Sequence, residues 1–205
     1  MKHSSYCENS LGLYKAFMSS HATFNSLSAI QNMIVSNDTR EALSNLSKFA
    51  RFIRRFSACA DQSYHSFTAE TELLNSYLEL ERLRFSEHLT FNIKISDSLK
   101  DDSFSVPTLL LMPLLEQQLL SGLKAGLEEI VLTLEFTRTK NILEAHISLS
   151  EAVAPAEDLQ LSNEQVNRLK LFNDRVEIYN TEIAGSVMKS AQGAGNETII
   201  RLLIQ

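Results

Sequence analysis

The chain has 205 residues, of which 44% are hydrophobic and 21% are charged, enough for one ordinary domain or two small ones with a buried core. Six glycines and three prolines exclude a disordered or collagen-like chain. The formal net charge of -6 excludes the diffuse positive field on which nonspecific nucleic-acid binding depends, so we expect no nucleic-acid partner.

Cysteine content and hydropathy favour a cytoplasmic location. The two cysteines, Cys7 and Cys59, have neither metal-ligand spacing nor a framework of pairs, which predicts reduced thiols. The chain opens with Lys2, His3 and a polar stretch rather than a signal peptide. The longest apolar run, residues 106–115, is far shorter than the ~20 residues that a bilayer requires, so no membrane span is expected.

The first part of the chain has a helical period. Apolar side chains recur at spacings of 4, 3, 4 and 3, at Ala42, Leu46, Phe49, Ile53 and Phe56. A looser version of this pattern occupies residues 13–34, and residues 36–39 between them offer a turn and helix caps. The pattern predicts an antiparallel helical hairpin with one apolar flank open. A second copy would close that flank into a four-helix bundle, so we predict a dimer.

A third helix is expected over residues 68–85. Leucines and a tyrosine line one side of it. The simplest interpretation of its charged residues is a solvated face, formed by Glu70, Glu72, Glu79, Glu81, Arg82 and Arg84.

After residue 88 the apolar period changes to two. Alternation predicts strands at residues 89–95, 130–136 and 145–149, and a closing hairpin at 187–204 with its turn at 193–195. Helices are expected at residues 106–123 and 162–180, and a surface loop at 151–161. Helices that cover only one face of the strands predict a two-layer α/β sandwich. The predicted fold class is therefore α+β, with a helical dimerisation domain at residues 1–87 and a sandwich at 88–205.

Three segments resemble the LytS-type bacterial sensor histidine kinases. Residues 17–31, FMSSHATFNSLSAIQ, resemble the family's Q-x-N-P-H-F-x-F-N-S-L-N-S-I-Q stretch. Residues 46–54 resemble its L-S-K-F-x-R-x-x-R pattern, and residues 70–85 its E-x-x-x-L-x-x-Y-L-x-L-E-x-x-R-F pattern. Residues 106–116 resemble the lead-in to the family's ATP-binding domain. The resemblance implies a sandwich of the GHKL ATPase type.

The same resemblance implies that His21 is the phospho-acceptor and that Asn25 belongs to its catalytic motif. A histidine beside a bundle seam is open to an attacking carboxylate, although an amphipathic-helix histidine without chemistry is the alternative. Ser20 replaces the family's proline, and Ala22 and Thr23 replace two bulky apolar residues, which alters the packing around the imidazole.

The nucleotide motifs depart from the family pattern. The expected E-N-A-x-x-H-G stretch begins here with Glu116 and Gln117, and the longer glutamine displaces the amide oxygen that should hold Mg²⁺. Glu151 is at best a displaced counterpart of the adenine-binding aspartate, and Arg168 stands where a glycine belongs. No glycine occurs between Gly126 and Gly185. Phosphate loops need residues without a Cβ, so we predict a degenerate domain that has lost ATP and Mg²⁺ binding.

Other possible sites are few. Arg51, Arg54 and Arg55 form a basic cluster, interpreted either as a solvated face paired with glutamates or as a docking patch for a receiver domain. His65, His88 and His146 have no ligand spacing, so no metal site is expected. We also expect no Cys–His arrangement and no P-loop.

Three functions remain open. The first is a histidine phosphotransfer protein in a two-component phosphorelay, in which His21 exchanges a phosphoryl group with the aspartate of a response regulator receiver domain. The second is a non-catalytic regulator that dimerises with itself or forms a heterodimer with a related kinase. The third is an active ATP-dependent kinase, against which the missing glycines count.

Overall fold

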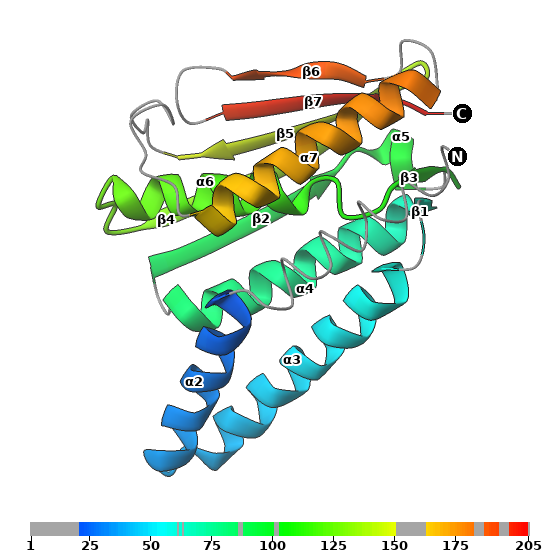
Figure 1. Ribbon diagram of the computed structural model, residues 1–205. Helices are drawn as coiled ribbons and strands as arrows, with labels where there is room; N and C mark the ends of the chain where they lie inside the picture. The colour runs from blue at the N-terminus through cyan, green and yellow to red at the C-terminus, as the bar shows by residue number, and fades with distance from the viewer. Residues whose placement is uncertain are drawn as a thin grey trace.

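The computed structural model has an α+β fold in which helices precede a sheet (Figure 1). It describes residues 21–60, 62, 64–85, 88–100, 103–150, 163–182, 187–192 and 197–204. In chain order the elements are α2 (His21–Val35), α3 (Thr39–Ala60), β1 (Tyr64–Ser66), α4 (Phe67–Phe85), β2 (Leu89–Ile95), α5 (Asp97–Lys100), β3 (Ser105–Pro107), α6 (Met112–Lys124), β4 (Ile130–Thr139), β5 (Ile142–Leu149), α7 (Asn163–Glu182), β6 (Val187–Gln192) and β7 (Glu197–Leu203).

Helices α2 and α3 form the predicted hairpin, which projects from the body of the molecule (Figure 1). The turn lies at residues 36–38, where Asn37 has a φ of 66°. Asparagine tolerates this left-handed conformation better than most residues. Asp38 then caps α3, because its Oδ1 accepts a hydrogen bond from the backbone N–H of Glu41 at 3.2 Å. The predicted turn at residues 36–39 is confirmed.

Helix α4 packs against both the hairpin and the sheet (Figure 1). Its Leu73, Leu74 and Leu78 are 0% exposed and join Phe56 of α3 in one hydrophobic core that continues into the strands. Two sides of the helix are therefore covered. For this reason the prediction of a solvated charged face is wrong at Glu70, 1% exposed, and at Glu81, 4% exposed.

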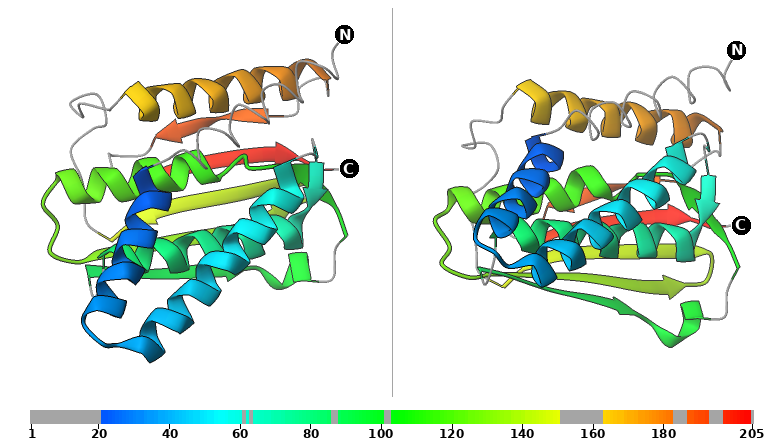
Figure 2. Two further views of the ribbon diagram at one scale, coloured as in Figure 1. Left: turned by 60° about the horizontal axis from the view of Figure 1, so that its bottom comes forward. Right: turned by 90° about the horizontal axis from the view of Figure 1, so that it is seen from below.

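The sheet has five strands in the order β2-β4-β5-β7-β6. Strand β2 pairs with β4 in parallel, from Leu89 opposite Ile130 to Ile95 opposite Phe136, and the other neighbours are antiparallel. Buried and half-buried residues alternate along β4 and β5, as the period of two predicts. Helices α4, α6 and α7 lie on one face, giving two layers (Figure 2). The predicted strands and the helix at 162–180 are confirmed, while the 193–195 turn, Ser162 and the 151–161 loop lie outside the described residues.

The predicted helix at residues 106–123 is wrong in its first turns. Residues 105–107 form β3, which pairs antiparallel with β1, and α6 begins only at Met112. Proline at position 107 favours an extended conformation for Val106 before it. Leu109 then has a φ of 57°, which is incompatible with a right-handed helix. The next proline, Pro113, lies in the first turn of α6, where the missing N–H costs no helical hydrogen bond.

Within the part of the chain that the structure describes, no helix combines the length and apolar character needed to cross a membrane.

Candidate functional site

The candidate phospho-acceptor lies at the first described residue of α2. Helix α2 begins at His21, whose side chain is outside the described residues. One turn later Asn25 is half-buried, and Ser26 and Ile30 are each 4% exposed. The buried residues fix which side of α2 faces the rest of the molecule.

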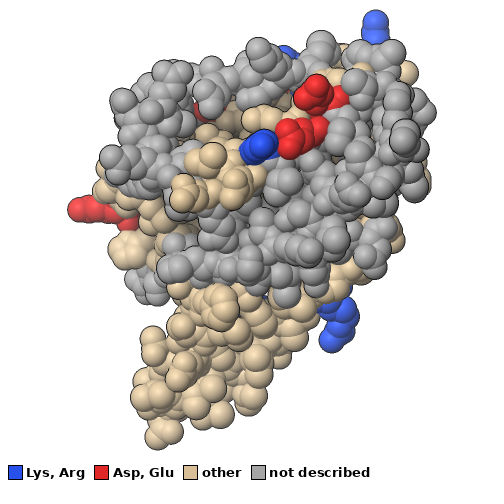
Figure 3. Space-filling view, in the orientation of Figure 1, with Lys and Arg blue, Asp and Glu red and all other residues tan. Residues whose placement is uncertain are grey.

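The opposite side of the hairpin is an apolar flank. It consists of large side chains that no described part of the chain covers: Phe24, Leu27, Ile34 and Val35 of α2 and Leu43 and Leu46 of α3, from 41% to 81% exposed. On the face shown in Figure 3 no Lys, Arg, Asp or Glu side chain is visible at the lower end of the hairpin. The hairpin therefore has the open apolar flank that the heptad pattern predicts, and Leu46 belongs to it rather than to the internal seam.

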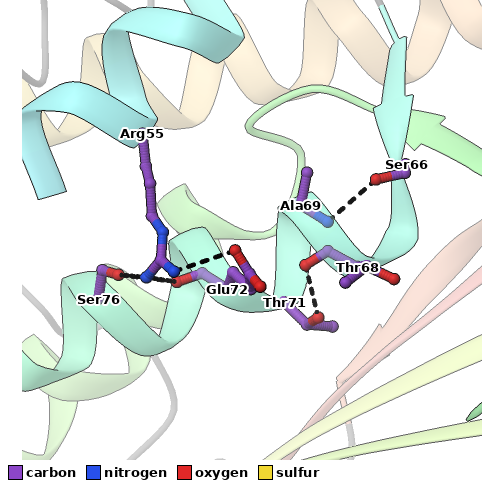
Figure 4. A network of polar contacts seen from close by, with 7 residues as sticks. All are labelled: Arg55, Ser66, Thr68, Ala69, Thr71, Glu72 and Ser76. Carbon is purple, nitrogen blue, oxygen red and sulfur yellow. Dashed lines mark hydrogen bonds and ion pairs between the residues drawn. The ribbon is translucent and has the colours of Figure 1, made fainter. Parts of the chain in front are cut away.

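The three arginines of the basic cluster have different surroundings. Arg55 reaches from α3 to α4, where its guanidinium donates hydrogen bonds to Glu72 Oε2 at 3.0 Å and to the Ser76 hydroxyl (Figure 4). Arg51 and Arg54 are exposed, with no ion-pair partner among the described residues. Arg55 thus joins two helices, and the two free guanidinium groups lie on the surface of α3.

Helix α6 carries Glu116 and Gln117, the residues that the sequence resemblance aligns with the family's nucleotide-binding motif. Glu116 and Gln117 are half-buried. The next residue, Gln118, is buried and donates from Nε2 to Thr198 Oγ1 of β7 at 2.7 Å, while its Oε1 has no hydrogen-bond partner among the described residues. This amide joins α6 to the sheet. Glu151 lies outside the described residues, as does the side chain of Arg168 in α7.

No group of three histidine, cysteine or carboxylate side chains suited to a metal ion occurs among the residues that the structure describes. A catalytic zinc site needs three such protein ligands. The described part of α6 and the sheet therefore contains no dedicated metal centre of this kind.

The sequence analysis missed a cluster that we call the buried triad: Cys59, His65 and Glu70. Cys59 Sγ lies 3.1 Å from His65 Nδ1, and His65 Nε2 lies 2.6 Å from Glu70 Oε2. All three are buried, and the thiol of Cys59 is free. The expectation of no Cys–His arrangement is wrong because β1 turns the chain back after α3 and brings the two side chains together. No known sequence motif signals this spacing.

Electrostatics favours a charged imidazolium in the buried triad. Burial alone would lower the pKa of His65, but hydrogen bonds to Cys59 and Glu70 and the negative charge of Glu70 outweigh burial and raise this pKa to about 9. His65 is therefore protonated at neutral pH and donates from both ring nitrogens.

Comparison with known proteins decides the family. Residues 10–89 match the sequence model of the histidine kinase family, described as "Histidine kinase". The sensor protein LytS of Oceanobacillus iheyensis is 28% identical over 127 residues, which cover 62% of this chain. Residues 10–89 are a histidine kinase domain of the LytS type. The protein YwpD of Bacillus subtilis is 30% identical over 173 residues, or 78% of this chain. The chain spans 21% of LytS and 60% of YwpD, so it covers less than two thirds of either relative.

The solved structures that match this chain have lower sequence identity to it than the two relatives above. A bacterial phosphotransferase solved at 1.7 Å matches over 95% of each chain, with 12% identity and a TM-score of 0.48. The histidine kinase AdeS of Acinetobacter baumannii matches over 87% of this chain and 94% of its own, with 13% identity and a TM-score of 0.41.

Proposed function

We propose that this chain is a two-component signalling protein that transfers phosphoryl groups at His21 and does not use ATP. The observation that carries the proposal is the combination of a LytS-type phospho-acceptor segment with a glycine-free stretch from residue 127 to 184. The first supports a reactive histidine, and the second argues against a nucleotide site. The boundary predicted between residues 87 and 88 is part of this proposal as a division of function, since the two parts share one hydrophobic core.

The phosphoryl transfer needs only a neutral imidazole and a phosphorylated partner. A lone pair on a His21 ring nitrogen attacks phosphorus in the acyl phosphate of a receiver aspartate. The P–N bond forms as the P–O bond to the aspartate breaks, and the bonding electrons leave with the carboxylate. The hairpin supplies position and access, and the receiver domain supplies most of the charge stabilisation. Asn25, one turn further along α2, belongs to the same motif.

ATP and Mg²⁺ do not fit the residues of this chain. In the family pattern an asparagine amide holds Mg²⁺, whereas Gln117 has a side chain one methylene longer. The adjacent Gln118 amide is committed to Thr198 of the sheet. Backbone amides approach phosphates closely where glycine is present, and the segment that should form both phosphate loops has none. We therefore treat the sandwich as a degenerate relative of the GHKL ATPases, and we route no step through a nucleotide.

Dimerisation through the apolar flank is the second part of the proposal. Six large apolar side chains lie exposed along α2 and α3, on a hairpin whose heptad spacing suits a four-helix bundle. A second copy offers an identical flank, so the interface is self-complementary about a two-fold axis. The same flank of a related kinase would give a heterodimer.

The receiver domain is proposed to contact Arg51 and Arg54. Both guanidinium groups are exposed on α3, whereas Arg55 is held by Glu72 and Ser76. Receiver domains present carboxylates around the phosphorylated aspartate, and positive groups favour approach of such a surface. Arg55 is then a structural residue of the hairpin rather than a docking residue.

A regulator without chemistry is the alternative function. The observation that favours it is the apolar flank itself, which suffices for occupying the dimer interface of a related kinase. In that case His21 has no role. An ATP-dependent kinase ranks third, because it needs the phosphate loops that the glycine-free stretch lacks.

The test is label transfer from two sources. The purified chain is incubated with a phosphorylated receiver domain, and a parallel sample is given radiolabelled ATP and Mg²⁺. The proposal expects acid-labile label from the receiver only, absent in His21→Ala and retained in the matched control His88→Ala. Label from ATP would establish a kinase. Label from neither source, with the dimer intact, would leave the regulator.

A further inference from the structure

The buried triad joins four segments that are separated in the sequence. Cys59 lies in the last turn of α3, His65 in β1 and Glu70 in the first turn of α4. Glu70 also reaches the turn before α6, where its Oε2 accepts the N–H of Leu109 at 3.3 Å and its Oε1 accepts the N–H of Leu111 at 3.4 Å. A continuous chain of polar contacts thus runs from the hairpin to the start of α6.

The turn that Glu70 holds has an unfavourable backbone. Leu109 has a φ of 57°, which residues other than glycine, asparagine and aspartate rarely adopt. Its side chain is 0% exposed. The two N–H groups of this turn therefore depend on the carboxylate, and α6 begins immediately afterwards at Met112.

The carboxylate in turn depends on His65. A cavity of about 10 Å³ next to Glu70 is lined by apolar groups, including Phe67, Val106 and Phe136, and it offers the carboxylate no polar partner. A buried carboxylate without a counter-charge is strongly unfavourable. The positive charge of His65 at 2.6 Å balances it, and Cys59 orients the same imidazole from the other side.

We propose that the buried triad couples the end of α3 to the turn before α6 and that this coupling depends on the proton of His65. The triad fixes the position of the turn relative to the end of α3. When His65 is protonated, Glu70 keeps its charge and both N–H contacts. Loss of that proton removes the counter-charge of the buried Glu70 carboxylate, which weakens its contacts and releases the turn at residues 108–111. Among the residues that the structure describes, the titratable groups that contact His65 are Cys59 from α3 and Glu70 from α4, and the 108–111 turn bonds to Glu70 through backbone N–H groups. The coupling does not require His21 to be phosphorylated.

Amide hydrogen exchange at Leu109 and Leu111 tests the coupling. In His65→Gln we expect exchange at both amides to rise at least tenfold at pH 7, while amides of β4 and β5 keep their wild-type rates. The matched control is His88→Gln, because His88 is exposed and its Nδ1 contacts the carbonyl of Glu128 at 2.7 Å, far in sequence from the triad. Unchanged rates at Leu109 and Leu111 in His65→Gln would overturn the proposal, as would an equal rise at all amides.

The variant Cys59→Ala distinguishes coupling through His65 from a purely local hydrogen bond between Glu70 and the turn before α6. Among the described residues the amides of Leu109 and Leu111 bond to Glu70 and the Cys59 thiol contacts His65, so a purely local role predicts wild-type exchange at both amides. Transmission through His65 predicts at least a threefold rise. If a variant fails to fold, amide exchange of the wild-type protein as a function of pH gives a second test. After correction for base-catalysed intrinsic exchange, protection of the Leu109 and Leu111 amides must fall as pH rises through about 9, the pKa of His65. Protection that persists at pH 10 would contradict the proposal.

Discussion

Leu43 gives a quantitative test of the apolar flank as a dimer interface. Its side chain is 60% exposed, and full burial of a leucine stabilises by about 1.5–3 kcal/mol, so covering Leu43 in a dimer contributes roughly 1–2 kcal/mol. A two-fold interface contains Leu43 from both copies, so the two side chains together contribute roughly 2–4 kcal/mol to dimerisation. Leu43→Gln keeps a good helix former and removes most of that gain. We therefore expect a dimer dissociation constant about 30- to 700-fold higher.

The assay is sedimentation equilibrium over a wide range of protein concentrations. Val166→Gln is the matched control, because Val166 is 50% exposed but lies on α7, away from the hairpin. Wild-type protein and the control should share one dissociation constant. An equal weakening in both variants, or a wild-type protein that stays monomeric at all concentrations, would refute the reasoning.

Three further predictions concern charge and backbone conformation. The pKa of His65 is about 9 in the folded state, against 6.5 for a free histidine, and this difference stabilises the fold by about 3 kcal/mol. The stabilisation is complete below pH 6.5 and is lost as pH rises to about 9. Denaturant titrations should show this loss in wild type and not in His65→Gln. Arg54→Glu should weaken receiver binding about 5- to 10-fold, measured by calorimetry, whereas Lys170→Glu on α7 should leave it unchanged. Lys140→Gly should stabilise by about 0.5–1 kcal/mol relative to Lys140→Ala, because position 140 has a φ of 56°; equal melting temperatures would contradict this.

Sequence periodicity predicted the elements whose apolar pattern repeats. The 4, 3, 4, 3 spacing of residues 42–56 predicted α3, because side chains at this spacing fall on one face of a helix that must pack against a neighbour. Alternation at Ile130, Leu132 and Leu134 specified β4 for the same reason. The apolar run at residues 106–111 carried no period, so its prolines and the left-handed Leu109 decided its structure instead.

The candidate site divides in the same way. His21 and the departures at Gln117 and Arg168 could be found from local motifs alone. The buried triad could not, because its members come together only after β1 reverses the chain and after α4 becomes enclosed between the hairpin and the sheet. Glu70 opens the segment that resembles the family pattern, but nothing in that pattern indicates that its carboxylate is buried. A residue's burial is a property of the whole fold.

The position of α4 determines how the molecule unfolds. Because the core that contains Phe56 of α3 also contains Leu78 of α4, Leu89 of β2 and Ile200 of β7, no solvent layer separates the hairpin from the sheet. Removing either part would leave a full face of α4 bare. We therefore expect thermal melting to be one cooperative transition, and fragments cut at residue 87 to aggregate rather than fold. The helix in the middle makes the two ends of the chain depend on each other for stability.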